Sequence, residues 1–358
     1  MSGSLITLVS KGVQDAYLIN NDGGSSLFKT VFTRHTNFSM APKRLDITGQ
    51  QPQAGGTSSI FIKNLGDLVN YVWLEGSSDM TNHLTGTVFD LYIGGQKIDS
   101  HSFEFLTYAW QAYQAESYSK SLILNSVITR TCPSFMPLHF FFCDMQSFLP
   151  LVSLSYHEVE IRITWGPDID GTETIIPWAN YIYLDTKERQ LMVDKPMEII
   201  ITQVQTIPFD VQPISVIDMT PLNHPVKTIF FGVNAKSEGD TFTFNGAELQ
   251  VNGTQVFEGL SPLYFHVVQS FFHTNFATIA YDNVLGQPNY TRLYMYNFCL
   301  NSTSFRPTGT CNFSRIDNSK MTLTGVSTNN TTLSGYLYAV NYNILKIQNG
   351  LGGILFSN

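Results

Sequence analysis

Charged side chains are scarce in this sequence. Asp, Glu, Lys and Arg make up 13% of the 358 residues, about half of the quarter that is usual in globular proteins. Aromatic residues reach the same 13%, and apolar residues total 43%, which excludes a disordered chain and supplies a large core. The shortage of Lys and Glu, beside many Phe, Tyr, Thr and Val, disfavours a mainly helical protein. At about 150 residues per domain, the length predicts two mostly β domains.

Clustered basic residues are missing as well. The formal net charge is −8 and the pI is about 5.4, whereas a nucleic-acid groove needs grouped Lys and Arg to neutralise phosphates. The nearest approaches to a basic cluster are Lys29 with Arg34, and Lys43 with Arg44. We interpret both as ordinary solvated positions, and we expect no direct nucleic-acid partner.

Long hydrophobic runs and targeting signals are also lacking. The most apolar stretch, residues 135–152, is interrupted by His139, Asp144 and Gln146, so no transmembrane helix is expected. The N-terminus has no basic start followed by an apolar segment, and Ser2 replaces the glycine that N-myristoylation requires. With this start, and with four cysteines that form no CxxC pair, the sequence favours folding in a reducing compartment.

Seven Asn-x-Ser/Thr sequons occur in this Asn- and Thr-rich chain, where chance accounts for most of them. Without a secretory signal we interpret them as unmodified. Asn37 and Asn312 are two of the seven. The other five are kept as candidate glycosylation sites: Asn252, Asn289, Asn301, Asn329 and Asn330.

Short apolar runs recur between turn signals, which is typical of a β-sandwich or jelly roll rather than of alternating βαβ units. The run at residues 88–93 leads into Gly94-Gly95, a pair typical of a tight hairpin turn. Two helices are predicted, at Phe103–Ala115 and Thr186–Val193. The clearest predicted strands are Ser58–Lys63, Val88–Ile93, Val159–Thr164, Glu198–Gln203, Met321–Thr324 and Leu333–Val340.

An internal repeat links the two halves of the chain. Five pairs of segments resemble each other in the same order, at spacings of 155 to 158 residues. This agreement predicts two copies of one fold, joined near the charged segment Asp185–Pro196. The pairs are Val69–Leu74 with Val226–Phe231, Leu91–Ile98 with Leu249–Val256, Phe142-Cys143 with Phe298-Cys299, Ser147–Pro150 with Ser304–Pro307, and Tyr181–Tyr183 with Tyr336–Tyr338.

Two similar sandwiches in one chain have a geometric consequence. If such a chain forms a trimer, six similar sandwiches surround one axis, and this pseudo-hexagonal block can tile a flat surface. The sequence therefore favours a shell-forming protein.

Several blocks of the sequence resemble the major capsid proteins of the nucleo-cytoplasmic large DNA viruses, the group that includes phycodnaviruses, iridoviruses and mimivirus relatives. The strongest block is Arg306–Asp317, and the similarity covers both ends and both halves. The other blocks are Leu5–Leu18, Phe28–Phe38, Ile93–Asp99, Pro137–Phe142, Leu149–Val159, Tyr181–Arg189, Ala339–Leu345 and Gly350–Gly353.

The resemblance implies an all-β fold of two tandem eight-stranded jelly rolls with few short helices. The expected division is an N-terminal arm at residues 1–26, jelly roll 1 at 27–190 and jelly roll 2 at 191–358. It also implies a structural late protein of the virion that forms homotrimeric, pseudo-hexagonal capsomers in an icosahedral shell assembled in the host cytoplasm. The implied partners are neighbouring capsomers, minor capsid and penton proteins, and the host-cell surface, with only indirect contact to an inner membrane.

The family motifs single out residues with an expected structural role. We expect Arg315 and Asp317 to lie on one face of a strand, either paired with each other or bonded across an interface. The full set is Gly94, Gly95, Pro150, His157, Asp185, Arg189, Arg306, Pro307, Asn312, Arg315 and Asp317.

Motifs that carry chemistry are absent. His157-Glu158 does not begin an HExxH motif because residue 161 is Ile, and we expect His157 to be a hydrogen-bonded structural residue on a strand spanning 154–161. Residues 168–173 alternate carboxylates as Ca²⁺ loops do, but they lack the rest of such a loop and are interpreted as an acidic turn. We therefore predict no enzyme activity, no catalytic or metal-binding residues and no cofactor.

Other functional classes remain open at this point: a carbohydrate-binding sandwich, suggested by the many Tyr, Trp and Asn, a jelly-roll enzyme, and a minor capsid protein. Subunit-contacting and outer surfaces are expected in loops. The candidate loops are Gly76–Gly86, Gly166–Trp178 and Asn275–Asn289, and the arm Met1–Ser26 is predicted to lie under the shell.

Overall fold

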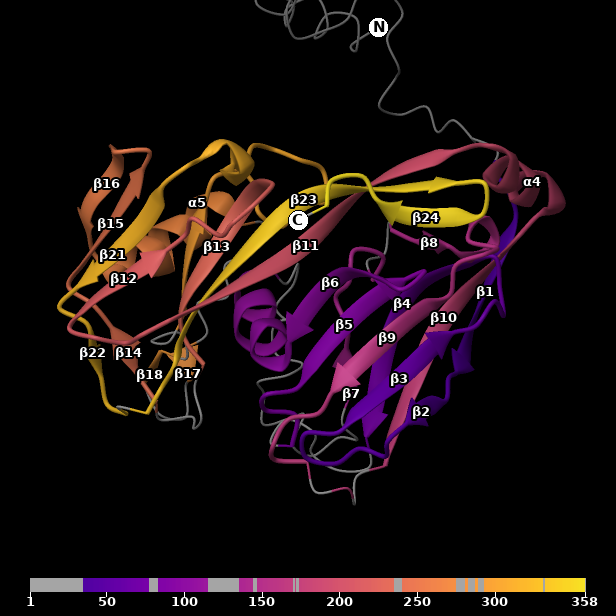
Figure 1. Ribbon diagram of the computed structural model, residues 1–358, viewed down its shortest axis with the longest axis horizontal. Helices are drawn as coiled ribbons and strands as arrows, with labels where there is room; N and C mark the ends of the chain where they lie inside the picture. The colour runs from indigo at the N-terminus through magenta and orange to yellow at the C-terminus, as the bar shows by residue number, and fades with distance from the viewer. Residues whose placement is uncertain are drawn as a thin grey trace, which may run out of the picture. The chain divides into compact units, whose positions relative to one another are not determined.

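The computed structural model describes residues 35–76, 83–114, 135–143, 147–169, 171, 174–234, 240–274, 281–282, 287–288, 293–330 and 332–357 (Figure 1). The chain divides into two units, residues 1–37 and 38–358, and every strand named below belongs to the second. The predicted arm, residues 1–26, lies outside the described residues. Among the helices of the described part, none is long and apolar enough to cross a membrane.

The first half of the second unit forms two antiparallel sheets (Figure 1). Sheet 1 has the order β1-β10-β4-β7, with β8 also paired to β4, and sheet 2 has the order β2-β3-β9-β5-β6. The bounds are β1 Phe38–Arg44, β2 Ile47–Gly49, β3 Thr57–Ile62, β4 Leu68–Gly76, β5 Val88–Ile93, β6 Gln96–Ser102, β7 Phe135–Pro137, β8 Leu149–Pro150, β9 Val159–Thr164 and β10 Ile175–Leu184.

The second half repeats this arrangement. Sheet 3 has the order β11-β23-β13-β19, with β20 paired to β13 and β24 to β23, and sheet 4 has the order β12-β21-β15-β16. Two small sheets pair β14 with β22 and β17 with β18. The bounds are β11 Met197–Phe209, β12 Ile214–Asp218, β13 Pro225–Val233, β14 Phe242–Thr243, β15 Gly246–Val251, β16 Thr254–Leu260, β17 Tyr281–Asp282, β18 Gln287–Pro288, β19 Leu293–Asn297, β20 Cys311–Asn312, β21 Ser319–Thr324, β22 Ser327–Thr328, β23 Gly335–Gln348 and β24 Leu351–Ile354.

The strand orders confirm two tandem jelly rolls built on one plan. Each strand of sheet 1 has a counterpart in sheet 3, which has β24 in addition, and the β5-β6 hairpin of sheet 2 corresponds to the β15-β16 hairpin of sheet 4. Trp73 of β4 pairs with Trp178 of β10, as Phe230 of β13 pairs with Tyr338 of β23. Trp178 is therefore the counterpart of Tyr338.

Two of the five segment matches predicted from the sequence disagree with the observed strand pairing. The predicted match of Tyr181 with Tyr336 is wrong, because Tyr181 pairs with Val69 whereas Tyr336 pairs with Gly232. Strand β10 aligns with β23 at a spacing of 160 residues on both sides of a bulge that the two sheets share, so the spacing of 155 paired the wrong residues. The match of Pro150 with Pro307 is wrong as well, because Pro150 lies in β8 and Pro307 precedes β20.

Hydrophobic alternation explains most strands. In β9, Val159, Ile161 and Ile163 are buried in the first core while Glu160 and Arg162 point outward, which confirms the predicted period of two. The predicted strand Val88–Ile93 and its hairpin turn are confirmed as β5, Gly94-Gly95 and β6. The predicted Leu333–Val340 strand is longer, since β23 extends to Gln348.

Sheet 3 is buried on both faces. Every residue of β13 from Val226 to Val233 is buried. Ile229 and Phe231 pack in the core of the second jelly roll, whereas Phe230 packs in the core of the first. This two-sided burial explains why β13 shows a nearly continuous apolar run in place of alternation, whereas burial alternates at the start of β11, where Ile200 is 41% exposed.

Helices follow equivalent strands in the two halves. After β6 comes the π-helix η1 (Phe105–Gln114), and after β16 come the π-helix η3 (Tyr264–Val268) and the α-helix α5 (Gln269–His273). The helix predicted at residues 103–115 is thus confirmed, since residues 103–104 are α-helical and continue into η1. The predicted Thr186–Val193 helix is confirmed as α4 (Thr186–Asp194), between the two halves. Short 3₁₀ helices occur at η2 (Leu151–Ser153) and η4 (Phe313–Arg315).

Three local expectations are wrong. His157 does not lie on a strand, because it follows a turn at residues 155–156 and β9 begins only at Val159. Arg315 and Asp317 do not share a strand face, because Arg315 ends η4 and Asp317 precedes β21. The candidate loop ending at Trp178 is shorter than expected, because β10 begins at Ile175. Most of the candidate loop 275–289 and part of the loop 76–86 lie outside the described residues.

Candidate functional site

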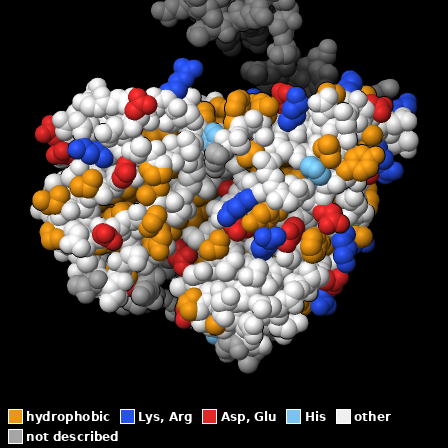
Figure 2. Space-filling model, viewed as in Figure 1, with side chains coloured by type: hydrophobic (Ala, Val, Ile, Leu, Met, Phe, Trp, Pro, Cys, Tyr) orange, Lys and Arg blue, Asp and Glu red, His pale blue; other side chains and the backbone are white. Residues whose placement is uncertain are grey.

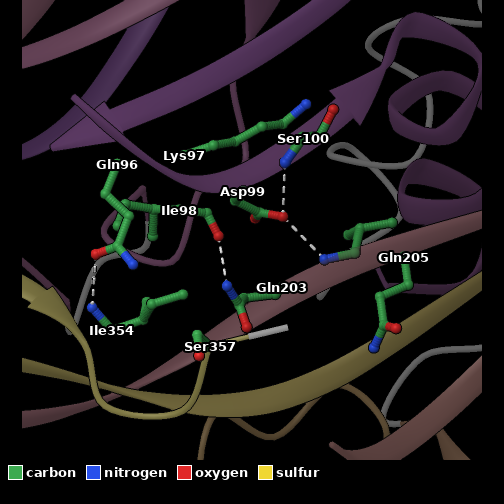
Figure 3. Close-up of a pocket in the computed structure, with 10 residues that line it drawn as sticks. Gln96, Lys97, Ile98, Asp99, Ser100, Gln203, Gln205, Ile354 and Ser357 are labelled. Carbon is green, nitrogen blue, oxygen red and sulfur yellow. Dashed lines mark hydrogen bonds between the residues drawn. The ribbon is translucent and has the colours of Figure 1, made fainter. Parts of the chain in front are cut away.

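The most extensive polar arrangement that joins the two jelly rolls lies where β6 meets β11. We call this region, which is built from β6, η1, β11 and the outer face of sheet 3, the inter-roll junction. A cleft of about 290 Å³ opens at its edge (Figure 3). The cleft is lined by Gln96, Lys97, Ile98, Asp99, Ser100, Gln203, Val204, Gln205, Ile354 and Ser357.

Side-chain hydrogen bonds connect β6 and β11 where paired strands would have backbone hydrogen bonds. Asp99 Oδ1 accepts the backbone N–H of Val204 at 2.8 Å, and the amide nitrogen of Gln203 donates to the carbonyl of Ile98 (Figure 3). Gln96 Oε1 accepts the N–H of Ile354 on the C-terminal hairpin at 3.2 Å. The open edge of β6 is therefore covered, which removes an exposed set of backbone donors and acceptors.

Asp99 is held on both oxygens. Its Oδ2 lies 2.8 Å from Nε2 of His101, and the two side chains are 1% and 3% exposed. The His101 ring stacks on Phe140 at a centroid distance of 4.9 Å. Nδ1 of His101 has no hydrogen-bond partner within the described part of the chain. The buried Asp99 carboxylate accepts a hydrogen bond from Val204 and contacts His101, and it thereby ties β6 to β11. Removing it would leave both partners buried without this contact.

The π-helix η1 provides the apolar half of the junction. Phe105 packs against Tyr338 at a ring-centroid distance of 5.4 Å, and Tyr113 packs against Phe230 at 5.7 Å. The Tyr113 hydroxyl donates to the carbonyl of Leu293 at 2.7 Å. Because Phe230, Tyr338 and Leu293 lie on the outer face of sheet 3, η1 of the first jelly roll closes the back of the second.

Burial shifts the ionisation of several groups near η1. Burial raises the pKa of Glu104, whose carboxylate accepts the N–H of Gly86 at 2.6 Å. Burial lowers the pKa of His266 to about 4, and its Nδ1 lies 3.2 Å from the Tyr113 hydroxyl. At neutral pH His266 is uncharged, so this part of the interface carries no positive charge that would need a partner.

The junction provides rigid attachment. Its acids and imidazoles are hydrogen-bonded inside a packed interface. No group of three or more His, Cys, Asp or Glu side chains that could hold a metal ion occurs among the residues that the structure describes. The cysteines Cys143, Cys299 and Cys311 are free thiols.

Among the residues predicted from motifs, Gly94 and His157 lie together at the tip of the β5-β6 hairpin. Nδ1 of His157 lies 2.9 Å from the carbonyl of Gly352 and 3.1 Å from its N–H. The His157 ring therefore links the first jelly roll to β24. Gly94 has a φ of +58°, and a Cβ on it would lie 2.3 Å from the His157 ring.

We expect Gly94→Ala to lower the free energy of unfolding by about 2–3 kcal/mol, since it adds left-handed backbone strain to a clash with His157. The matched control is Gly95→Ala, because Gly95 has a φ of +79° but open space around its Cβ position. Gly95→Ala should cost only the strain, about 1 kcal/mol. Thermal and urea unfolding of both variants measure the difference. Equal losses would contradict the proposed contact with His157.

Asp185 and Arg189 lie at the connection between the halves. Asp185 is the N-cap of α4, and Arg189 forms a two-pronged ion pair with Asp67, with Nε 2.8 Å from Oδ1. Asp67 also accepts the N–H of Leu184 at 2.8 Å. The pair therefore holds α4 against the first jelly roll. Pro150 is buried in β8, where it pairs with Leu68.

Comparison with known proteins matches both halves of this architecture. Residues 26–185 match the family described as the major capsid protein N-terminus, and residues 188–353 match the large eukaryotic DNA virus major capsid protein. The major capsid protein of Pyramimonas orientalis virus is 32% identical, with both chains covered in full. The chain belongs to the major capsid protein family of large eukaryotic DNA viruses.

Other members of the family agree in sequence and structure. The major capsid protein of Paramecium bursaria Chlorella virus 1 is 28% identical, again with both chains covered in full. A chain of the quasi-atomic model of the PBCV-1 virus capsid matches with a TM-score of 0.78 at 25% identity. The match covers 93% of this chain and 100% of the PBCV-1 chain.

The strongest family block, Arg306–Asp317, forms an exposed edge of the second jelly roll. Arg306 and Pro307 are exposed. Asn312 is the N-cap of η4 and accepts the N–H of Ser314 at 3.1 Å. The backbone N–H of Asp317 donates to Asn252 Oδ1 at 3.0 Å. The block is thus a set of capped turns, and the structural roles of its side chains beyond these contacts stay predictions.

The candidate glycosylation sites stay predictions as well. Asn252 and Asn329 are exposed, whereas Asn301 and Asn330 are half-buried. All four use Oδ1 to accept hydrogen bonds within turns or from a neighbouring segment. Asn289 lies outside the described residues.

Lys227, a buried lysine of β13, was not predicted from the sequence. It is 5% exposed, its Nζ donates to the carbonyl of Ser302 at 2.9 Å, and it lies 5.6 Å from the centre of the Tyr342 ring. Burial lowers its pKa to about 8. The signal that could have revealed it is a lone Lys inside the apolar run of β13.

The sequence reasoning also missed Asp99 and His101. The detectable signal is an Asp and a His two residues apart on one strand, hence on one face. The opposite face of the same sheet carries charged side chains, of which Lys97 and Arg162 are 47% and 41% exposed. Asp90 pairs with Lys97 at 2.8 Å and Glu160 pairs with Arg162 at 3.2 Å. In Figure 2, basic and acidic side chains gather over this sheet while most of the viewed face is uncharged.

Proposed function

We propose that three copies of this chain form a pseudo-hexagonal capsomer, and that such capsomers tile the icosahedral shell of a large DNA virus. One observation carries the proposal: the chain contains two jelly rolls of the same strand order, fixed to each other by the inter-roll junction. Three such units place six similar sandwiches around one axis, which approximates hexagonal symmetry with a threefold assembly.

The proposal also divides the chain into an arm and two domains. Residues 1–26 act as an arm, residues 27–190 as jelly roll 1 and residues 191–358 as jelly roll 2. The separate strand sets of the two halves and the position of α4 between β10 and β11 support this division. The protein acts as a structural component without enzyme activity.

The proposed partners are minor capsid and penton proteins that cement capsomers together, and assembly takes place in the host cytoplasm. Contact with an inner membrane is indirect and contact with DNA is absent. The net charge of −8 supports the last point, because it offers little to neutralise phosphates.

Mass photometry of the purified chain tests the capsomer proposal. We expect a main species at three times 40.2 kDa, because a pseudo-hexagonal block needs six sandwiches and each chain supplies two. A main species at 40.2 kDa over the whole accessible concentration range would contradict the proposal. Electron microscopy of the trimer fraction should show particles with a hexagonal outline.

A further inference from the structure

The junction inside one chain contains a contact that a second copy could repeat. Helix η1, which follows β6, inserts Phe105 and Tyr113 against Phe230 and Tyr338 on the outer face of sheet 3. Both participants in this contact have counterparts elsewhere in the chain. Helices η3 and α5 follow β16 as η1 follows β6, and sheet 1 has the strand order of sheet 3.

The counterpart of η1 presents an unusual exposed apolar surface. Leu263 and Phe271 each lie 158 residues after Phe105 and Tyr113, the spacing that also relates the hairpin residues Leu91 and Leu249. Leu263 is 64% exposed, Phe271 is 71% exposed, and Phe272 beside it is 70% exposed. We call these three residues the helix patch. Exposed apolar side chains grouped in this way mark interaction surfaces.

The counterpart of the sheet 3 face is also apolar and is partly exposed, with Trp73 and Trp178 half-buried. Trp73 and Trp178 stack on the outer face of sheet 1 at a centroid distance of 6.0 Å, and they correspond in register to Phe230 and Tyr338. Tyr71 lies 5.7 Å from Trp73 and is 43% exposed. We call Tyr71, Trp73 and Trp178 the sheet patch.

One polar group of the sheet patch already has a partner, because the Trp178 indole N–H donates to Glu75 at 2.9 Å. Tyr and Trp side chains are the type enriched at the centres of protein interfaces. The corresponding residues Phe230 and Tyr338 are fully buried in the contact within the chain. An equivalent contact from another chain would bury the sheet patch in the same way.

We propose that the helix patch of one copy packs on the sheet patch of a second copy, repeating between chains the contact that η1 makes with sheet 3 within a chain. The proposal rests on the trimer proposed above and assigns its interface. The two patches differ, so the contact is head-to-tail, and it forms a closed ring when three copies each use both patches. The intrachain and interchain contacts then alternate around six sandwiches.

Two charge substitutions test the assignment by mass photometry over a concentration series. Phe271→Glu and Tyr71→Glu should each weaken trimer formation by about 30-fold or more in concentration, since each places a charge at an apolar contact centre. The matched control is Ile214→Glu, an exposed apolar residue at 63% exposure on β12, which should leave the trimer unchanged. Circular dichroism and thermal melting confirm that all variants fold.

Mixing the two variants tests the head-to-tail geometry. The Tyr71→Glu chain keeps an intact helix patch and the Phe271→Glu chain keeps an intact sheet patch, so together they should form a species of twice 40.2 kDa that neither forms alone. The assignment is overturned if the variants trimerise like the wild type, if Ile214→Glu disrupts the trimer equally, or if the mixture forms no pair. A monomeric wild type would instead overturn the trimer itself.

Discussion

Asp99→Ala should lower the free energy of unfolding by about 3–5 kcal/mol, the typical loss when one partner of a buried pair is removed. The carboxylate accepts hydrogen bonds from Val204 and Ser100 and contacts His101. Its removal leaves the N–H of Val204 and the ring of His101 buried without this partner. Urea unfolding followed by tryptophan fluorescence measures the loss, and a matching fall in melting temperature should accompany it.

The control for Asp99 lies on the same hairpin. Asp90 pairs with Lys97 at 2.8 Å, and Lys97 is 47% exposed. Asp90→Ala should therefore cost about 1 kcal/mol or less. If Asp99→Ala fails to fold, Asp99→Asn retains an acceptor for Val204 and should give an intermediate loss. Equal stability of the Asp99 and Asp90 variants would show that the inter-roll junction does not depend on this carboxylate.

Lys227→Met should stabilise the protein by about 2 kcal/mol at pH 7. The pKa of Lys227 is lowered from 10.5 to about 8 by burial, and at about 1.4 kcal/mol per pH unit this difference is a penalty of about 3 kcal/mol on the charged form. Removing the charge removes this penalty, but losing the hydrogen bond to the carbonyl of Ser302 costs about 1 kcal/mol. Urea midpoints of the two proteins at pH 7 measure the effect.

The advantage of Lys227→Met should shrink at alkaline pH. Between about pH 8 and 10.5 the unfolded wild-type lysine binds a proton that the folded one has lost, so wild-type stability gains with pH from this group. Below pH 8 the lysine is protonated in both states and the penalty is constant. Cys299 and Tyr342 have raised pKa values through burial and act in the opposite direction.

The difference between Lys227→Met and wild type, measured at each pH, removes the contributions that the two proteins share. Lys43→Met is the matched control, because Lys43 is exposed on β1, and it should change stability by less than about 0.5 kcal/mol at every pH. A Lys227→Met variant that is less stable than the wild type at pH 7 would show that the buried ammonium is net favourable.

Sequence patterns predicted those parts of the fold in which one strand face meets solvent. The alternation in β9 and the turn at Gly94-Gly95 identified strands and a hairpin correctly, because each reflects a local geometric requirement. The repeat was detectable because both halves bury the same kind of hairpin. One match was misaligned because a Tyr-x-Tyr pattern occurs in both strands at a spacing of 155, whereas the pairing of β10 and β23 with their neighbours places equivalent residues 160 apart.

The junction was much less accessible to sequence reasoning. Asp99, His101 and Gln203 lie far apart in the chain or look like ordinary strand residues, and only packing of β6 on β11 gives them partners. Arg315 and Asp317 looked like a strand pair because alternation alone does not reveal a 3₁₀ turn. Lys227 shows a related limit, because its position in the apolar run of β13 is visible in the sequence but its partner, the carbonyl of Ser302, is 75 residues away.

The covalent pairing of two jelly rolls has an entropic consequence for assembly. Each free sandwich that joins a ring loses translational and rotational freedom, a cost estimated at about 4–15 kcal/mol per association. The bonds from Asp99 and Tyr113 complete half of the contacts in a six-sandwich ring before any two chains meet. A ring of tandem chains should therefore form at lower protein concentration than a ring of single sandwiches with the same contacts.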